Sequence, residues 1–192
     1  MPERAVVLAG GRSRRMGRDK SSIRLAGVPL LDWVLSLTEG LDIPTHVLTQ
    51  DRVSGLGPLG GVETACDRFQ EQQLLFLSCD MPFLNGEVIR RLAEAAPPLR
   101  GESAIYSVAG RVGFPFLFDR SGLALLGKRL EAGQRSLGGL ATALSCLQIE
   151  VSGHDRWRFA NVNTPTELDD AETVCLERAA ELVIPKPQPQ VG

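Results

Sequence analysis

The 192-residue sequence has no apolar run of the roughly 20 residues that a membrane-spanning helix needs. Met1–Arg4 lead directly into the first apolar segment, so we expect no signal peptide at this end. None of the cysteines forms the close pairs of a zinc site or suggests a secreted disulfide framework; they are Cys66, Cys79, Cys146 and Cys175. Reduced thiols in a cytoplasmic protein are therefore expected.

A large excess of one charge is also missing. The 21 Lys and Arg residues nearly balance the 23 Asp and Glu residues, which gives a formal net charge of −2. This balance argues against non-specific nucleic-acid binding, which needs a basic surface. A chain of this size suits one domain, and we expect it over residues 1–183. Residues 184–192, rich in proline and glutamine, are expected to be a disordered C-terminal tail.

Segments of strand character alternate with segments of helical periodicity along the chain. The expected strands are Ala5–Leu8, Thr45–Thr49, Leu74–Leu77, Ser103–Val108, Phe114–Phe118 and Ile149–Val151. The expected helices are Leu30–Gly40, Val62–Phe69, Gly86–Ala96, Leu123–Leu130, Leu137–Leu147 and one from Pro165 to about Val183. This alternation predicts a three-layer α/β/α, Rossmann-like domain with a mainly parallel sheet. Pro115 places its strand at a sheet edge or at a bulge.

The loop after the first expected strand is rich in glycine and positive charge. Ala9-Gly10-Gly11 follows the strand at once, and paired glycines let a backbone turn sharply and approach a ligand. Five cations follow within nine residues: Arg12, Arg14, Arg15, Arg18 and Lys20. A solvated basic loop is the simpler interpretation of a charge run alone. The tight glycine turn favours a loop whose amides and cations bind a triphosphate.

Two common phosphate-binding motifs are absent. Gly11, Gly17 and Lys20 do not have the spacing of a Walker loop, and the three spaced glycines of a dinucleotide site are missing. A second glycine loop, Gly57-Pro58-Leu59-Gly60-Gly61, precedes the helix expected from Val62. Such a loop suits an anion or the close approach of a flat base, although an ordinary turn would use the same residues.

Asp80 follows the apolar run Leu74–Leu77, which predicts a central strand buried on both faces. It therefore lies at the carboxyl end of a strand, where open α/β sheets bind their ligands. A carboxylate there suits Mg²⁺, which binds through one or two carboxylates and substrate phosphates. A helix cap or turn is the alternative, but Asn85 is available to cap the helix expected from Gly86.

Seven motifs occur in order along the chain: Leu8-Ala9-Gly10-Gly11, Arg15-Met16-Gly17, Asp19-Lys20, Gly57–Gly61, Cys79-Asp80-Met81-Pro82, Gly133-Gln134-Arg135, and Asn161-Val162-Asn163-Thr164-Pro165 with Glu167-Leu168. Together they resemble the motifs of the molybdenum cofactor guanylyltransferases, a family of nucleotidyltransferases. The resemblance covers Ala5 to about Leu182. The last motif is the most discriminating, since sugar and terpenoid nucleotidyltransferases share the first loop but rarely this ending.

The resemblance implies a nucleotidyltransferase fold and transfer of GMP from GTP to the molybdopterin cofactor, with release of pyrophosphate. It assigns Mg²⁺ to Asp80, and it assigns catalytic roles to Asp80, Arg15 and Lys20. Nucleotide contacts are implied at Leu8, Ala9, Gly10, Gly11, Lys20, Gln50, Asp51, Gly57, Pro58, Leu59, Gly60 and Asp80, and pterin contacts at Arg135, Asn161 and Asn163. Molybdoenzymes or cofactor-delivery proteins would be partners; neither nucleic acid nor a membrane is expected.

The sequence departs from the family pattern at two places. Gln50-Asp51 leads almost directly to Gly57, where the family has a longer segment, and Phe114-Pro115 replaces a pair that commonly has a polar residue before proline. Three alternatives are a cytidylyltransferase acting on the same pterin, another nucleotidyltransferase, and a non-catalytic nucleotide-binding adaptor. By the same resemblance, Gly10 and the Pro-Leu-Gly-Gly element favour GTP over CTP, since family members that use CTP tend to carry alanine in place of Gly10 and to lack that element. Retention of Arg15, Lys20 and Asp80, to which the resemblance assigns catalytic roles, argues against an adaptor.

Overall fold

The computed structural model describes residues 1–9, 23–50, 55–97 and 101–185. Its main sheet has the strand order β4-β1-β5-β7-β6-β8, and β2 and β3 form a separate hairpin. The strands are β1 (Arg4–Leu8), β2 (Arg24–Leu25), β3 (Val28–Pro29), β4 (Thr45–Leu48), β5 (Gln73–Ser78), β6 (Ala104–Val108), β7 (Arg111–Asp119) and β8 (Leu147–Glu150). The helices are α1 (Leu30–Gly40), α2 (Pro58–Arg68), α3 (Gly86–Ala95), α4 (Leu123–Glu131), α5 (Leu137–Ala143) and α6 (Pro165–Glu177), with 3₁₀ turns η3 (Arg120–Gly122), η4 (Gly153–Phe159) and η5 (Ala179–Glu181).

The main sheet is mostly parallel, as the alternation of strands and helices predicts. β1 pairs in parallel with both β4 and β5, and β6 pairs in parallel with β8. Within the described ranges, β7 alone runs against its neighbours, pairing antiparallel with β5 and β6. The fold class predicted from the sequence is therefore confirmed.

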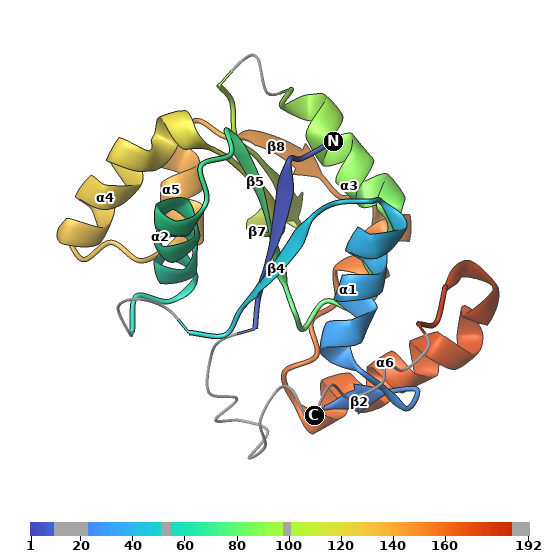
Figure 1. Cartoon of the computed structure of the whole chain (residues 1–192). Helices are drawn as coiled ribbons and strands as arrows, with labels where there is room; N and C mark the ends of the chain where they lie inside the picture. The colour runs from blue at the N-terminus through green and yellow to red at the C-terminus, as the bar shows by residue number, and fades with distance from the viewer. Residues whose placement is uncertain (10–22, 51–54, 98–100, 186–192) are drawn as a thin grey trace.

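Helices cover both faces of this sheet and make three layers (Figure 1). In β1, Ala5 and Val7 pack in the cluster that includes Val34 of α1 and Ile89 of α3. Val6, which points to the opposite face, packs in the cluster built with α2, α4 and α5. Because successive strand residues alternate between faces, β1 can be buried on both, which explains its uninterrupted apolar sequence.

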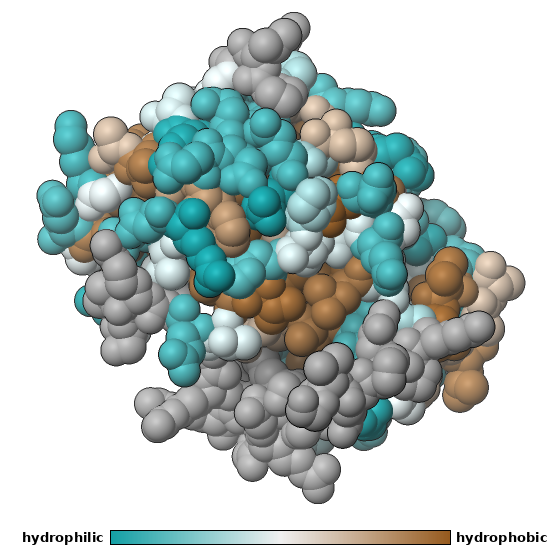
Figure 2. Space-filling model, in the orientation of Figure 1, coloured by the Kyte–Doolittle hydropathy of each residue, from teal (hydrophilic) through white to brown (hydrophobic). Residues whose placement is uncertain are grey.

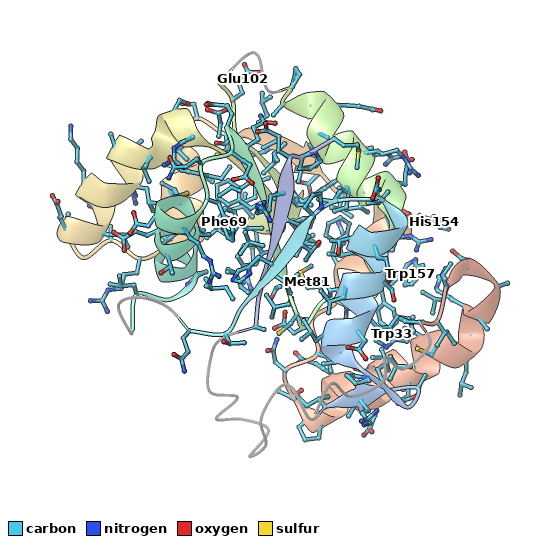
Figure 3. All side chains as sticks on the ribbon, in the orientation of Figure 1. Trp33, Phe69, Met81, Glu102, His154 and Trp157 are labelled. Carbon is cyan, nitrogen blue, oxygen red and sulfur yellow. The ribbon has the colours of Figure 1, made fainter. Side chains whose placement is uncertain are left out.

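A third apolar cluster lies beside the sheet and joins the hairpin to α1 and α6. It includes Leu25, Trp33, Phe83 and Val162, and the indole nitrogen of Trp33 donates to the carbonyl of Leu25 at 3.3 Å. The Phe83 ring lies between two tryptophans, with centroids 6.2 Å from Trp33 and 5.7 Å from Trp157. Figure 3 shows both tryptophans on the α1 side of the molecule. This cluster links segments that are far apart in sequence.

Three helix boundaries differ from the sequence prediction. α2 begins at Pro58 rather than Val62, because proline at the first helical position lacks only an N–H that the helix does not use. α5 ends at Ala143, since Ser145 has a φ of 51° and the chain reverses there into β8. α6 ends at Glu177 and is followed by η5 instead of continuing to Val183.

The strand that carries Pro115 is central, not an edge strand. β7 lies between β5 and β6, its ladder with β5 ends at Phe116, and its register with β6 shifts between Phe116 and Gly113. Pro115 falls in this bulge, where the ladder does not require an N–H from it. Of the two positions expected for this proline, the bulge is the one observed.

The structure shows the state of the cysteines and the lengths of the helices. All four cysteines are free and buried. Burial raises the pKa of the Cys66 thiol to about 12 and those of Cys146 and Cys175 to about 11, so these thiols stay protonated near neutral pH. Among the described residues, no helix combines the length and the apolar character that crossing a bilayer requires.

Candidate active site at the carboxyl edge of the sheet

Three neighbouring parallel strands end together at one edge of the sheet, here called the carboxyl edge: β1 at Leu8, β4 at Leu48 and β5 at Ser78. Leu8 is in register with both Leu48 and Ser78. The amide of Ala9 donates to the carbonyl of Leu48 at 2.9 Å, and the amide of Cys79 donates to that of Leu8 at 3.3 Å. Since the three loops start side by side, a ligand bound here can contact all of them.

Asp80 lies at this edge, in the turn after β5. The residue is only 6% exposed. Its carboxylate oxygen Oδ1 accepts from the hydroxyl of Ser78 at 2.5 Å, and its carbonyl accepts from the amide of Val162 at 2.9 Å. It does not cap α3, because Asn85 accepts from the Val88 amide at 3.1 Å and does so instead. The helix-cap alternative for Asp80 is therefore ruled out.

The Asp80 turn has the chemistry of a site for one hard cation. A buried carboxylate stands beside the start of a loop whose sequence carries five cations, where a polyphosphate would bring its own oxygen ligands. In the described part of the chain, no three His, Cys, Asp or Glu side chains gather where they could hold a metal. Asp80 supplies one carboxylate at this edge, and this fits Mg²⁺ bound largely through substrate phosphates and water.

The second glycine loop forms the first turn of α2. Gly57 precedes the helix with φ 64° and ψ −155°, a conformation open essentially to glycine alone. Pro58 begins the helix, Leu59 is fully buried, and the amide of Gly60 donates to the carbonyl of Gly57 at 3.1 Å. The helix start lies at the same end of the sheet as the ends of β1 and β4 (Figure 1). Its positive dipole end suits an anion or a polar ligand edge.

The residues expected to contact the pterin lie in two separate places. Asn161 and Asn163 flank Val162, whose side chain is fully buried and whose amide holds the Asp80 carbonyl. Arg135 instead follows α4 on the α2 side of the sheet, where its guanidinium donates to the carbonyl of Gly55 at 2.9 Å. The asparagine loop is thus joined to the Asp80 turn, and Arg135 is joined to the second glycine loop.

The remaining expected site residues divide in two groups. Leu8 and Ala9 are half-buried at the carboxyl edge, and Gln50 is exposed just beyond β4. Their positions agree with a ligand lying across the strand ends. Gly10, Gly11, Arg15, Lys20 and Asp51 lie outside the described residues.

Two residues that hold Asp80 were not recognised from the sequence. Ser78 stands two positions before Asp80, and this spacing is the only sequence signal for a side-chain bond between them. Val162 acts through its backbone amide, so its side-chain identity gives no signal of the contact. The Ser78 contact is local to the turn after β5, whereas the Val162 contact depends on how that turn packs against a segment about 80 residues later.

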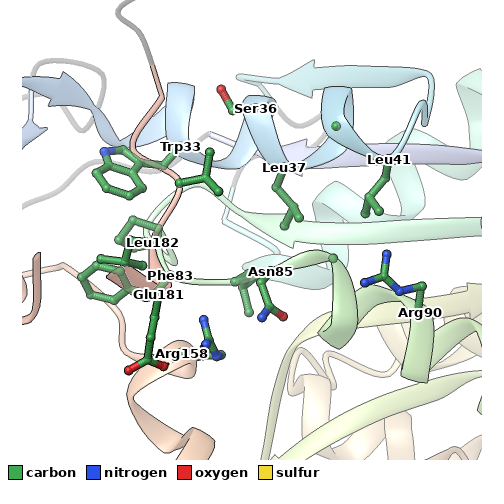
Figure 4. A pocket seen from close by; sticks show the side chains of 15 residues that line it. Trp33, Ser36, Leu37, Leu41, Phe83, Asn85, Arg90, Arg158, Glu181 and Leu182 are labelled. Carbon is green, nitrogen blue, oxygen red and sulfur yellow. Dashed lines mark hydrogen bonds and ion pairs between the residues drawn. The ribbon is translucent and has the colours of Figure 1, made fainter. Parts of the chain in front are cut away.

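A cavity of about 310 Å³ lies between α1 and α3, behind the Asp80 turn. Figure 4 shows Trp33 and Leu37 of α1, with Leu41 just after it, on one side and Phe83 and Arg90 on the other. None of the strand ends or glycine-loop residues of the carboxyl edge lines it. Figure 2 shows apolar side chains on the front face between the end of β4 and α1. The cavity shares Trp33 and Phe83 with the third apolar cluster, and its lining includes no residue of the strand ends.

Known proteins are similar to this chain in sequence over most of its length. Residues 5–144 match the MobA-like NTP transferase domain. A molybdenum cofactor guanylyltransferase of Rhodobacter capsulatus is 30% identical over 87% of this chain and 93% of its own. One of Xanthomonas euvesicatoria pv. vesicatoria is 29% identical over 86% of this chain and 92% of its own.

A solved structure extends the likeness to three dimensions. The molybdopterin-guanine dinucleotide biosynthesis protein A of Archaeoglobus fulgidus is similar with a TM-score of 0.71 and 23% identity. The alignment covers 91% of this chain and 99% of that one, so it extends beyond residue 144. The chain belongs to the MobA-like NTP transferase family.

Proposed function

We propose that this protein transfers GMP from GTP to the terminal phosphate of the molybdopterin cofactor, giving molybdopterin guanine dinucleotide and pyrophosphate. The observation that carries the proposal is the hydrogen bond from the Val162 amide to the Asp80 carbonyl, 2.9 Å long. It joins the carboxylate of the carboxyl edge to the asparagine loop whose sequence sets the guanylyltransferases apart. Relatives about 30% identical over most of the chain bear the name of this activity.

The acceptor phosphate is already an anion and needs no strong base, so the protein has mainly to position the two substrates and neutralise their charge. An oxygen of that phosphate attacks the α-phosphorus of GTP, and the bond to the bridging oxygen breaks as pyrophosphate leaves with the electron pair. Asp80 would hold Mg²⁺, which when bound supplies Lewis-acid stabilisation of the phosphate oxygens. Arg15 and Lys20 would neutralise the triphosphate and the departing pyrophosphate.

The nucleotide would lie across the strand ends. Backbone groups of Leu8–Gly11 and of Gly57–Gly60 would flank guanine and ribose, because glycine lets the backbone approach closely. Gln50 and Asp51, which follow β4 in the sequence, would also contact the nucleotide. Pro58 and Leu59 fix the direction of the second glycine loop, because Pro58 begins α2 and Leu59 is fully buried.

The pterin phosphate would face the other side of the Asp80 turn. Asn161 and Asn163 would supply amide groups from a loop that two bonds hold in place. One is the bond from the Val162 backbone amide to the Asp80 carbonyl. In the other, the backbone amide of Asn163 donates to the carboxylate of Glu167 at 2.7 Å. Arg135 would approach from the α2 side, with one of its five N–H donors engaged by Gly55.

The product would pass to molybdoenzymes or to cofactor-delivery proteins in the cytoplasm. The free, buried cysteines are those that a reducing compartment maintains. Neither nucleic acid nor a membrane has a part in this proposal.

The test is product formation with GTP and CTP side by side. Purified protein is incubated with molybdopterin cofactor, Mg²⁺ and one nucleotide, and the products are identified by mass spectrometry. We expect the guanine dinucleotide and pyrophosphate, with a clear preference for GTP, because the wrong base leaves buried polar groups unpaired at about 1–3 kcal/mol each. Better turnover of CTP would favour the cytidylyltransferase alternative. Tight GTP binding without turnover would favour an adaptor.

A further inference from the structure

We propose that Ser78 is a positioning residue, which fixes the Asp80 carboxylate in the orientation that binds the divalent cation. The inference rests on the proposed function, because it concerns the cation that Asp80 would hold. Ser78 need not touch substrate or metal; it acts through the hydrogen bond from its hydroxyl to Oδ1 of Asp80.

Strand pairing and backbone hydrogen bonds hold the backbone around Asp80 in place. Ser78 is in register with Leu8 of β1, and the Cys79 amide donates to the Leu8 carbonyl at 3.3 Å. The Met81 amide donates to the Ser78 carbonyl at 3.3 Å, and the Val162 amide to the Asp80 carbonyl at 2.9 Å. The peptide units before and after Asp80 therefore have little freedom to turn.

The neighbouring side chains add to this rigidity. Cys79 and Met81 are 6% and 4% exposed, and both pack in the core between the sheet and the α1–α3 layer. With backbone and neighbours fixed, the torsions of the Asp80 side chain decide where its two oxygens point. The Ser78 hydroxyl bonds directly to one of those oxygens and so restricts these torsions.

A carboxylate that already has one orientation loses less conformational freedom when it binds a cation. Hydrogen bonds from outside the ligand sphere orient ligands in this way, and their loss typically lowers metal affinity about 10- to 100-fold. The effect should therefore appear in metal binding itself, whether or not the second substrate is present.

The chain contains a matched control. The hydroxyl of Ser152 donates to a carboxylate oxygen of Asp155 at 3.1 Å, in an exposed segment that begins η4. Ser152→Ala removes a serine–aspartate bond of the same kind without touching the Asp80 turn. Ser78→Ala removes the bond under test, and Ser78→Thr keeps the hydroxyl.

The experiment measures Mn²⁺ binding to the full chain by electron paramagnetic resonance in the presence of GTP, with thermal unfolding of each variant as the fold control. We expect Ser78→Ala to raise the Kd for Mn²⁺ about tenfold or more. Ser78→Thr and Ser152→Ala should stay near wild type, and Asp80→Asn should abolish the binding. In turnover, Ser78→Ala should need correspondingly more Mg²⁺ for half-maximal rate, with kcat near wild type at saturating metal.

Equal Kd values for wild type and Ser78→Ala would overturn the inference while leaving the proposed function intact. A folded Ser78→Thr that loses as much affinity as Ser78→Ala would overturn it too, because the hydroxyl is then not the active feature. If wild-type protein with GTP bound no Mn²⁺, the proposed function would fall together with the inference.

Discussion

Arg15 and Lys20 differ from the other cations of their loop in the roles that the family resemblance assigns to them. We expect Arg15→Ala and Lys20→Ala to lower kcat/KM for GTP about 10- to 100-fold, because each variant loses one charge-assisted hydrogen bond to phosphate. Arg12→Ala and Arg18→Ala should have much smaller effects, since solvated charges contribute little. Steady-state kinetics of the four variants decides between these roles. Equal losses at all four would mean that bulk positive potential binds the triphosphate.

The buried thiols predict a dependence of stability on pH. Burial raises the pKa of Cys66 from 9.0 to about 12, and those of Cys146 and Cys175 to about 11. Above the unfolded value the folded chain keeps protons that the unfolded chain releases, so this stability is complete below pH 9.0 and is lost as pH rises through the folded values. We expect the free energy of unfolding to fall by about 1 kcal/mol per thiol by about pH 10.

Urea unfolding across the alkaline range measures this slope. Cys66→Ala is the matched variant, because it removes the most strongly shifted thiol and should flatten part of the dependence. A wild-type slope that the variant leaves unchanged would show that other groups cause the alkaline loss.

At the scale of elements, the start of α2 is the part of the site most sensitive to backbone change. Gly57→Ala forces an ordinary residue into φ 64°, ψ −155° and should cost about 1–3 kcal/mol. It should also raise KM for GTP, because the first turn of α2 would shift. Gly127→Ala is the control: it lies inside α4, nothing is within 4 Å of an added Cβ, and it should stabilise by about 0.5–1 kcal/mol. Thermal unfolding and GTP kinetics would check both; a Gly57→Ala protein with wild-type stability would contradict the backbone argument.

The sequence predicted those elements whose local signals agree with the fold. Asn85 caps α3 as expected, because a cap depends on residues within one turn, and Thr164 caps α6 in the same way. The hairpin of β2 and β3 was not predicted as strands, since two-residue strands carry no periodicity. Gly60 and Gly61 concealed the true start of α2, because glycine disfavours a helix interior unless packing holds it.

Strand neighbours could not be predicted at all. Pairing of β7 between β5 and β6 is a long-range property, and local sequence predicted only that Pro115 needs an edge or a bulge. The same limit applies to the site. The position of Asp80 after a buried strand could be predicted, whereas its bond to Val162 depends on the packed fold. Its bond to Ser78 depends on the conformation of the turn after β5.

At the scale of the whole molecule, the parallel part of the sheet explains why the site residues converge. β1, β4 and β5 run in one direction, so their following loops emerge at one edge. The third apolar cluster contains both Val162 and Phe83, which stands three residues after Asp80, and the Val162 amide bonds to the Asp80 carbonyl, so the asparagine loop is held beside the Asp80 turn. Met81 follows the carboxyl end of β5 and Glu102 precedes the amino end of β6, and Figure 3 labels both residues.

Two buried aspartates at opposite edges allow the central claim to be tested in one comparison. Asp80 lies at the carboxyl edge, whereas Asp119 ends the antiparallel β7 and accepts from the Ser121 amide and the Gln72 side chain, both at 2.9 Å. The measurement is kcat/KM for GTP with molybdopterin cofactor and Mg²⁺ in wild type, Asp80→Asn and Asp119→Asn, each shown to be folded by circular dichroism. We predict that Asp80→Asn loses about 10²- to 10³-fold or more, while folded Asp119→Asn stays near wild type. Wild-type turnover by folded Asp80→Asn would contradict the account.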